Sequence, residues 1–259
     1  MKTTLIITGQ LRLQENQTPT EKINYHIQNL KPDNTVLFLW ENEYQKYKQE
    51  LDSLKLQIIT ENQNLPIVTE QQLLNCHKHI NQQPNTLTPL IYNQANKIFY
   101  SNLIKSYFII QQAFKNNKSQ TDLYIKTRYD LHYQSNFNIN PLFQFINENK
   151  PIITTPFGGD MFAIGLGDLL TITNNKANEI FKTYYDNFIK MLDEDKIPLN
   201  AEMLIRYVFK NLNHADIYRI NFHCTTQHML SNNHFYHGLK QYGEMIGKDN
   251  LYLPNYKIV

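Results

Sequence analysis

Cysteine, glycine and charge are all scarce in this chain of 259 residues. Its two cysteines, Cys76 and Cys224, are too few for a disulfide framework and form no C-x-x-C metal pattern, so a reducing compartment is expected. The eight glycines exclude a collagen-like repeat. Because 17 tyrosines and 14 phenylalanines are present, we expect a packed globule and not a charge-driven disordered chain.

Long hydrophobic runs are also lacking. The first apolar run, Leu5 to Ile7, is too short for a signal peptide, and no stretch approaches the roughly 18 apolar residues that span a bilayer. The 25 basic and 23 acidic side chains leave a net charge of +2, which is too balanced to predict nucleic-acid binding. These absences predict a cytoplasmic protein without a nucleic-acid partner.

Short β-branched apolar runs alternate with helical patterns in the first sixty residues. Buried strands are predicted at residues 5–7, 36–40 and 56–59, and helices at 20–30 and 43–54. Such an alternation is typical of a parallel sheet with helices on both faces.

The chain after residue 60 has a less regular pattern. Helices are predicted at 71–80, 95–114 and 199–212, with another opening at Gly167–Asp168, and strands at 123–125, 151–156, 161–165 and 217–220. The last forty residues are polar and aromatic without a clear period, so an irregular C-terminal segment is expected. No repeat or linker divides the chain, which predicts one α/β domain over residues 1–259.

Thr8, Gly9, Gln10 and Arg12 directly follow the first predicted strand. In open α/β sheets ligands bind outside the carboxyl ends of the strands, where a glycine lets the backbone approach a nucleotide and an arginine can reach a phosphate. The P-loop pattern is absent. An ordinary turn with a surface arginine is the alternative.

Lys126, Arg128 and Asp130 follow a strand in the middle of the chain. Alternation places Arg128 and Asp130 on one side of an extended segment. An arginine can neutralise a diphosphate, and an aspartate can hold a divalent metal on the same oxygens. A plain ion pair is an equally good interpretation.

Two further carboxylates are candidate bases. Asp160 follows the glycine pair at 158–159, and Glu202 lies in the first turn of the helix predicted at 199–212. A capped glycine turn and an ordinary helix start, with Asn200 as N-cap, explain the same residues. His223 is a weak ligand candidate, because no histidine has a zinc spacing.

In their order, these segments resemble bacterial surface-polysaccharide glycosyltransferases, especially WavE-like lipopolysaccharide and capsule synthesis proteins. The resemblance rests on Gly9–Arg12, Phe38–Trp40, Ile125–Leu131, Gly159–Gly165 and Ala201–Glu202, and covers most of residues 3–212.

The resemblance implies a GT-A-like, Rossmann-type mixed sheet and a nucleotide-sugar donor. Residues 1–130 would form the nucleotide-sugar-binding half and 131–259 the acceptor half. Thr8, Gly9, Gln10, Arg12, Lys126, Arg128 and Asp130 would bind the donor, and Asp160 or Glu202 would be the catalytic base.

Metal use stays open at this point. Arg128 stands where the fold usually carries the first aspartate of Asp-x-Asp, so the arginine could replace the charge of Mn²⁺ or Mg²⁺, which Asp130 would otherwise hold.

The resemblance also implies an oligosaccharide or lipid-linked glycan acceptor of lipopolysaccharide or capsule, reached at the inner face of the cytoplasmic membrane. Two alternatives remain: a nucleotidyl- or phosphotransferase with a similar nucleotide cleft, and a non-catalytic carbohydrate-binding protein that uses its surface aromatic residues.

Overall fold

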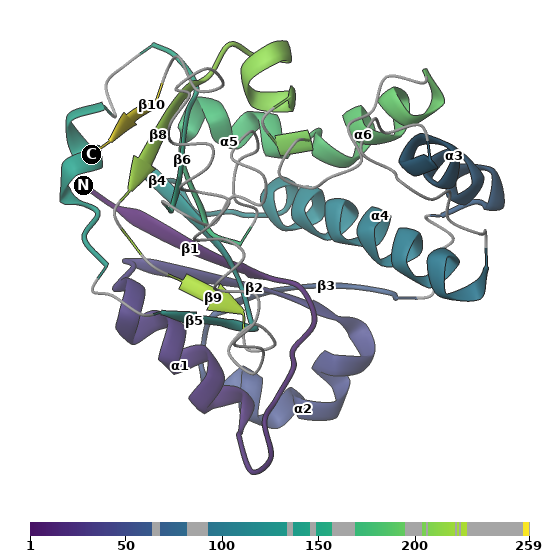
Figure 1. Ribbon diagram of the computed structural model, residues 1–259. Helices are drawn as coiled ribbons and strands as arrows, with labels where there is room; N and C mark the ends of the chain where they lie inside the picture. Colours follow the sequence, from purple (N-terminus) through teal and green to yellow (C-terminus); the bar gives the residue numbers. More distant parts are fainter. Residues whose placement is uncertain are drawn as a thin grey trace, which may run out of the picture.

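A mixed β-sheet with helices on both of its faces forms the body of the protein in a computed structural model (Figure 1). The structure describes residues 1–63, 68–81, 93–133, 137–145, 149–156, 169–194, 204–205, 207–220, 222, 224–226 and 256–258.

The N-terminal third follows the predicted alternation of strands and helices. Its elements are β1 (Thr3–Thr8), α1 (Pro19–Leu30), β2 (Asn34–Trp40), α2 (Glu41–Ser53) and β3 (Gln57–Glu61). A capping box starts α1, since Thr18 Oγ1 accepts from the Glu21 amide at 3.2 Å and Glu21 accepts from the Thr18 amide at 2.9 Å.

The later elements depart from the sequence prediction in places. They are α3 (Glu70–Asn81), α4 (Gln94–Lys115), β4 (Leu123–Arg128), β5 (Leu131–Tyr133), the 3-10 helix η1 (Asn140–Phe145), β6 (Ile152–Pro156), β7 (Thr171–Asn174), α5 (Asn175–Phe181), α6 (Tyr184–Asp193), the π-helix η2 (Tyr207–Leu212), β8 (Asp216–Ile220), β9 (Cys224–Thr226) and β10 (Tyr256–Ile258).

The prediction of a helix that opens at Gly167–Asp168 is wrong for the described part of that segment. Residues 171–174 form the buried strand β7, and the helix α5 starts only at Asn175. The reason is the run Thr171-Ile172-Thr173, whose β-branched residues favour a strand. The strand predicted at 161–165 lies outside the described residues, and of the helix predicted at 199–212 the described part is helical, with a π-helix at 207–212.

Eight described strands form the main sheet in the order β10-β8-β6-β7-β4-β1-β2-β3. β1 is parallel to both β2 and β4, whereas β7 runs antiparallel to both of its neighbours. A small second sheet pairs β5 with β9. The α/β class and the Rossmann-type mixed sheet are therefore confirmed. The division into two halves at residue 130 stays a prediction.

Alternate residues of the central strands enter two different hydrophobic cores. Ile6 and Phe38 pack in the core that contains α4, α5 and α6, whereas Leu5, Ile7 and Leu39 pack in the core of α1 and α2. This two-residue period is the geometry of a strand buried on both sides. The helices accordingly cover opposite faces, as Figure 1 shows for α1 and α4.

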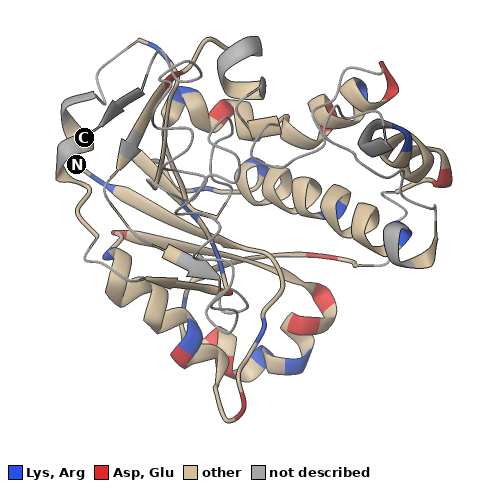
Figure 2. Cartoon of the chain, viewed as in Figure 1, with Lys and Arg blue, Asp and Glu red and all other residues tan. Residues whose placement is uncertain are grey.

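The outer surface of α1 and α2 carries both signs of charge, which lie side by side in Figure 2. Among the helices that the structure describes, none is both long and apolar enough to cross a membrane.

Candidate functional site

A pocket of about 420 Å³ opens at the carboxyl ends of β1, β2 and β4. From β1 the chain passes outward to β2 and β3 and then returns to the opposite side of β1 as β4. The pocket thus lies at the point where the strand order reverses, which is where open α/β sheets bind ligands. Helix α4 forms the facing side.

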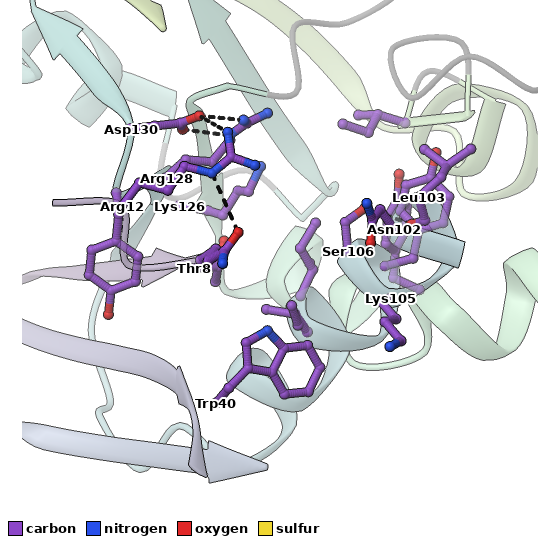
Figure 3. Close-up of a pocket in the computed structure, with 18 of the residues that line it drawn as sticks. Thr8, Arg12, Trp40, Asn102, Leu103, Lys105, Ser106, Lys126, Arg128 and Asp130 are labelled. Atoms are coloured by element: carbon purple, nitrogen blue, oxygen red, sulfur yellow. Dashed lines mark hydrogen bonds and ion pairs between the residues drawn. The ribbon is translucent and has the colours of Figure 1, made fainter. Parts of the chain in front are cut away.

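Arg12, Lys126, Arg128 and Asp130 form one side of this pocket, here called the arginine wall (Figure 3). The Arg128 guanidinium donates to both oxygens of Asp130, from Nε at 2.9 Å and from Nη2 at 2.7 Å. The Arg12 Nη1 lies 3.9 Å from the same carboxylate. Arg12 and Arg128 are 62% and 34% exposed against 11% for Asp130, so both guanidiniums remain accessible to a ligand.

The Asp130 carboxylate stays ionised among these cations. Burial alone would raise its pKa, but the hydrogen bonds from Arg128 and the charges of Arg128 and Arg12 outweigh burial and hold the pKa below its ordinary value. Lys22 of α1 contributes a further positive charge near Asp130. Burial lowers the pKa of Lys22, and the Asp130 charge partly opposes this shift.

The turn that carries Asp130 is fixed by its buried neighbour Tyr129. The Tyr129 hydroxyl donates to the Phe38 carbonyl at 3.1 Å, and the Tyr129 carbonyl lies 3.1 Å from Nε2 of the buried His26. Because a carbonyl only accepts, His26 Nε2 must carry the proton. Its Nδ1 then accepts from the Tyr133 hydroxyl at 2.6 Å. The position of the Arg128–Asp130 pair is therefore set by the core beneath it.

The loop that carries Arg12 is held by Glu43 of α2. Gly9 has φ of +100°, a conformation that side-chain-bearing residues rarely adopt, and turns the chain at the end of β1. Glu43 then accepts from the Leu11 amide at 3.1 Å and from the Trp40 amide at 3.4 Å. Burial raises the pKa of Glu43, while these two amides lower it.

All seven residues predicted to bind the donor line this pocket: Thr8, Gly9, Gln10, Arg12, Lys126, Arg128 and Asp130. The two motifs that carry them lie far apart in the sequence and meet because β1 pairs with β4, with Thr8 opposite Arg128. Asp160, Glu202 and His223 lie outside the described residues.

Sequence reasoning missed the side of the pocket that α4 provides. Phe99, Asn102, Lys105 and Ser106 of α4, here called the α4 wall, also line the pocket. Figure 3 shows Asn102, Lys105 and Ser106 across the pocket from the arginine wall. The helical period of α4 was visible in the sequence, but it pointed to the apolar core side. It gave no sign that the polar residues beside this stripe face a cavity.

The pocket residues that the structure describes do not fit a divalent metal. Both oxygens of Asp130 accept from Arg128, and Arg12 and Lys22 add positive charge around them. Asp130 is the only carboxylate among the described lining residues, and no cluster of three acidic, histidine or cysteine side chains occurs in the described part of the chain. Mg²⁺ and Mn²⁺ prefer several oxygen ligands, which this group does not provide.

Comparisons with known proteins give distant structural likenesses alone. No protein-family model matches the sequence, and no curated protein matches it. Mouse xyloside xylosyltransferase 1 is similar at 12% identity and a TM-score of 0.41, covering 93% of this chain and 92% of that one.

Two bacterial structures give similar values. HddC from Yersinia pseudotuberculosis is 9% identical with a TM-score of 0.44, covering 93% and 100% of the two chains. The inositol-1-phosphate CTP transferase of T. maritima is 10% identical with a TM-score of 0.37, covering 94% and 97%.

Proposed function

We propose that the pocket binds the diphosphate of a nucleotide sugar and that the chain transfers the sugar to a glycan acceptor. The observation that carries this proposal is the placement of the Arg12 and Arg128 guanidiniums beside Gly9 at the strand-order reversal. A planar guanidinium donates two parallel hydrogen bonds to phosphate oxygens, and each charge-assisted bond contributes about 1.5–3 kcal/mol.

The charge balance of the pocket supports an anionic ligand. Arg12, Lys105, Lys126 and Arg128 line it together with a single described carboxylate, Asp130. Because Asp130 neutralises only part of this charge, the pocket attracts a polyanion. A volume of about 420 Å³ lies within the range of about 300–1,000 Å³ that is usual for small-molecule sites.

In the proposed reaction a base takes the proton of an acceptor hydroxyl, and the resulting oxygen attacks the anomeric carbon of the sugar. The bond from that carbon to the diphosphate breaks, and its electron pair leaves with the diphosphate oxygen. Arg12 and Arg128 stabilise the charge that develops there, and the Arg128 guanidinium is already held by Asp130 before the reaction. Asp130 acts as a positioning residue that holds Arg128.

The base remains Asp160 or Glu202 in this proposal. The acceptor is proposed to be a lipopolysaccharide or capsule oligosaccharide at the inner membrane face, on the basis of the ordered sequence segments alone. We propose that the arginines supply the charge that Mn²⁺ or Mg²⁺ would otherwise supply, because the described donor set around Asp130 suits a guanidinium better than a metal.

The test combines binding and product analysis. The protein is titrated by calorimetry with UDP-, GDP-, CDP- and dTDP-sugars, and the release of nucleoside diphosphate in the presence of oligosaccharide acceptors is measured. We expect saturable binding of at least one donor and diphosphate release that Asp160→Asn or Glu202→Gln abolishes without loss of binding.

Other outcomes would identify the alternatives. Release of pyrophosphate from a nucleoside triphosphate would indicate a nucleotidyltransferase. Binding of glycans without any turnover, unaffected by Asp130→Ala, Asp160→Ala and Glu202→Ala, would indicate a carbohydrate-binding protein. The absence of nucleotide-sugar binding, with and without Mn²⁺, would contradict the proposal.

A further inference from the structure

One face of α4 presents a regular row of side chains to the pocket. Phe99, Asn102, Ser106 and Ile109 follow one another at steps of three and four residues and all line the cavity. This spacing keeps them on one side of the helix. Figure 3 shows Asn102 and Ser106 across the pocket from Arg128 and Asp130.

The polar groups of this row are available to a ligand. The Asn102 side chain is exposed and has no hydrogen-bond partner among the described residues. Its amide offers two donors and one acceptor. The Ser106 hydroxyl donates to the Leu103 carbonyl at 2.7 Å, which leaves its oxygen free to accept.

The apolar groups around Asn102 and Ser106 suit a ligand ring whose polar groups all lie at its edge. Phe99 is 56% exposed at one end of the row, whereas Trp40 and Tyr107, at 8% and 2%, keep their ring faces buried. The described wall therefore offers little aromatic surface deep in the pocket for a flat base. It offers instead the amide of Asn102 and the hydroxyl of Ser106. These two residues are about 6 Å apart along the helix axis, because they are separated by four residues and the helix rises by about 1.5 Å per residue.

We propose that Asn102 and Ser106 bind hydroxyl groups of the donor sugar, so that the α4 wall selects the sugar while the arginine wall binds the diphosphate. This inference rests on the proposed function, because it assigns the second half of the same ligand. Hydroxyl groups both donate and accept, as do the groups of Asn102 and Ser106, and the diphosphate, once held by Arg12 and Arg128, leaves the sugar to extend toward α4.

The experiment compares each nucleotide sugar with its own nucleoside diphosphate. Calorimetric affinities are measured for the UDP-, GDP-, CDP- and dTDP-sugars and the four parent diphosphates, with wild type, Asn102→Ala and Ser106→Ala. Gln112→Ala is the matched control, since Gln112 carries an amide on α4 but does not line the pocket. Thermal unfolding of each variant checks that the fold is intact.

We expect wild type to bind one nucleotide sugar more tightly than its diphosphate. Asn102→Ala should lower the affinity for that sugar nucleotide by about three- to tenfold, the size of one hydrogen bond, and leave the affinity for the diphosphate unchanged. Ser106→Ala should act in the same direction, and Gln112→Ala should change neither affinity.

Three results would overturn the inference while leaving the proposed function intact. These are an unchanged sugar preference in both variants, an equal loss of affinity for sugar nucleotide and diphosphate, and equal binding of the two ligands by wild type. If wild type binds none of these nucleotides, the proposed function fails and the inference fails with it.

Discussion

The buried His26 makes the stability of the folded chain depend on pH in a predictable way. Burial is the main cause that lowers the pKa of His26 from 6.5 to about 4; the hydrogen bond to the Tyr129 carbonyl and the Asp130 charge oppose this shift, and the nearby Lys22 and His132 add to it. The folded state therefore keeps His26 neutral under conditions in which the unfolded chain protonates it.

The sign and size of the effect follow from this difference. Above about pH 6.5, His26 is neutral in both the folded and the unfolded state, so it does not lower the free energy of unfolding. As the pH falls toward 4, the unfolded state binds a proton that the folded state does not, so folding becomes less favourable. At about 1.4 kcal/mol per pH unit, the window between 6.5 and about 4 corresponds to a loss of about 3 kcal/mol.

The test uses His26→Gln, whose amide can donate to the Tyr129 carbonyl and accept from the Tyr133 hydroxyl but does not titrate. The free energy of unfolding is measured by urea denaturation at several pH values between 4 and 8. The dependence of the free energy of unfolding on pH should decrease in the variant by about 1.4 kcal/mol per pH unit, because the variant lacks one titrating proton. His214→Gln, at an exposed position, is the control. If His26→Gln folds and keeps the wild-type slope, the assignment of a buried neutral imidazole is wrong.

Three further predictions concern the core and the cysteines. Tyr129→Phe removes the hydrogen bond to the Phe38 carbonyl and should lower the free energy of unfolding by about 1 kcal/mol in urea denaturation; an unchanged value would mean that this bond is not formed. Phe114→Ala empties a fully buried ring position and should cost about 3–5 kcal/mol in the same assay, and a cost below 1 kcal/mol would contradict the packing of α4. Burial raises the pKa of Cys76 to about 12, so a thiol reagent should label the partly exposed Cys224 in the folded protein and reach Cys76 only in denaturant; rapid labelling of both would refute this.

The start of the fold could be predicted from the sequence because its signals are local. Leu5 to Ile7 and Val36 to Trp40 are uninterrupted apolar runs, and each is followed by a helical period, so strand and helix could be told apart by length and spacing. The four-residue strand β7 was missed although Thr171-Ile172-Thr173 is a β-branched run, because the run is short and its burial depends on pairing with β4 and β6.

The arginine wall could be predicted in part. A two-residue period places Arg128 and Asp130 on one side, and the structure places their side chains in direct contact although Asp130 lies in the turn after β4. The interpretation as an ion pair is confirmed by these contacts, whereas the interpretation as a ligand site stays a prediction for a pair that lines the pocket.

Long-range contacts account for what the sequence did not reveal. Glu43 reaches the Leu11 amide from 32 residues away, and no local pattern distinguishes it from the other acidic residues of α2. Asn102 and Ser106 of the α4 wall look like ordinary solvent-facing positions until the carboxyl ends of β1 and β4 are placed opposite them.

The proposed function requires the Arg12 and Arg128 guanidiniums to bind a nucleotide diphosphate at the strand-order reversal. This binding is measured by calorimetry of the diphosphate of the preferred donor with wild type, Arg128→Lys, Arg128→Ala and the exposed control Lys115→Ala. We expect Arg128→Lys to weaken binding about tenfold, because charge remains but the two-bond geometry is lost, and Arg128→Ala to weaken it more. Lys115→Ala should leave the affinity unchanged. Equal affinities for wild type and Arg128→Ala would show that Arg128 does not bind the diphosphate.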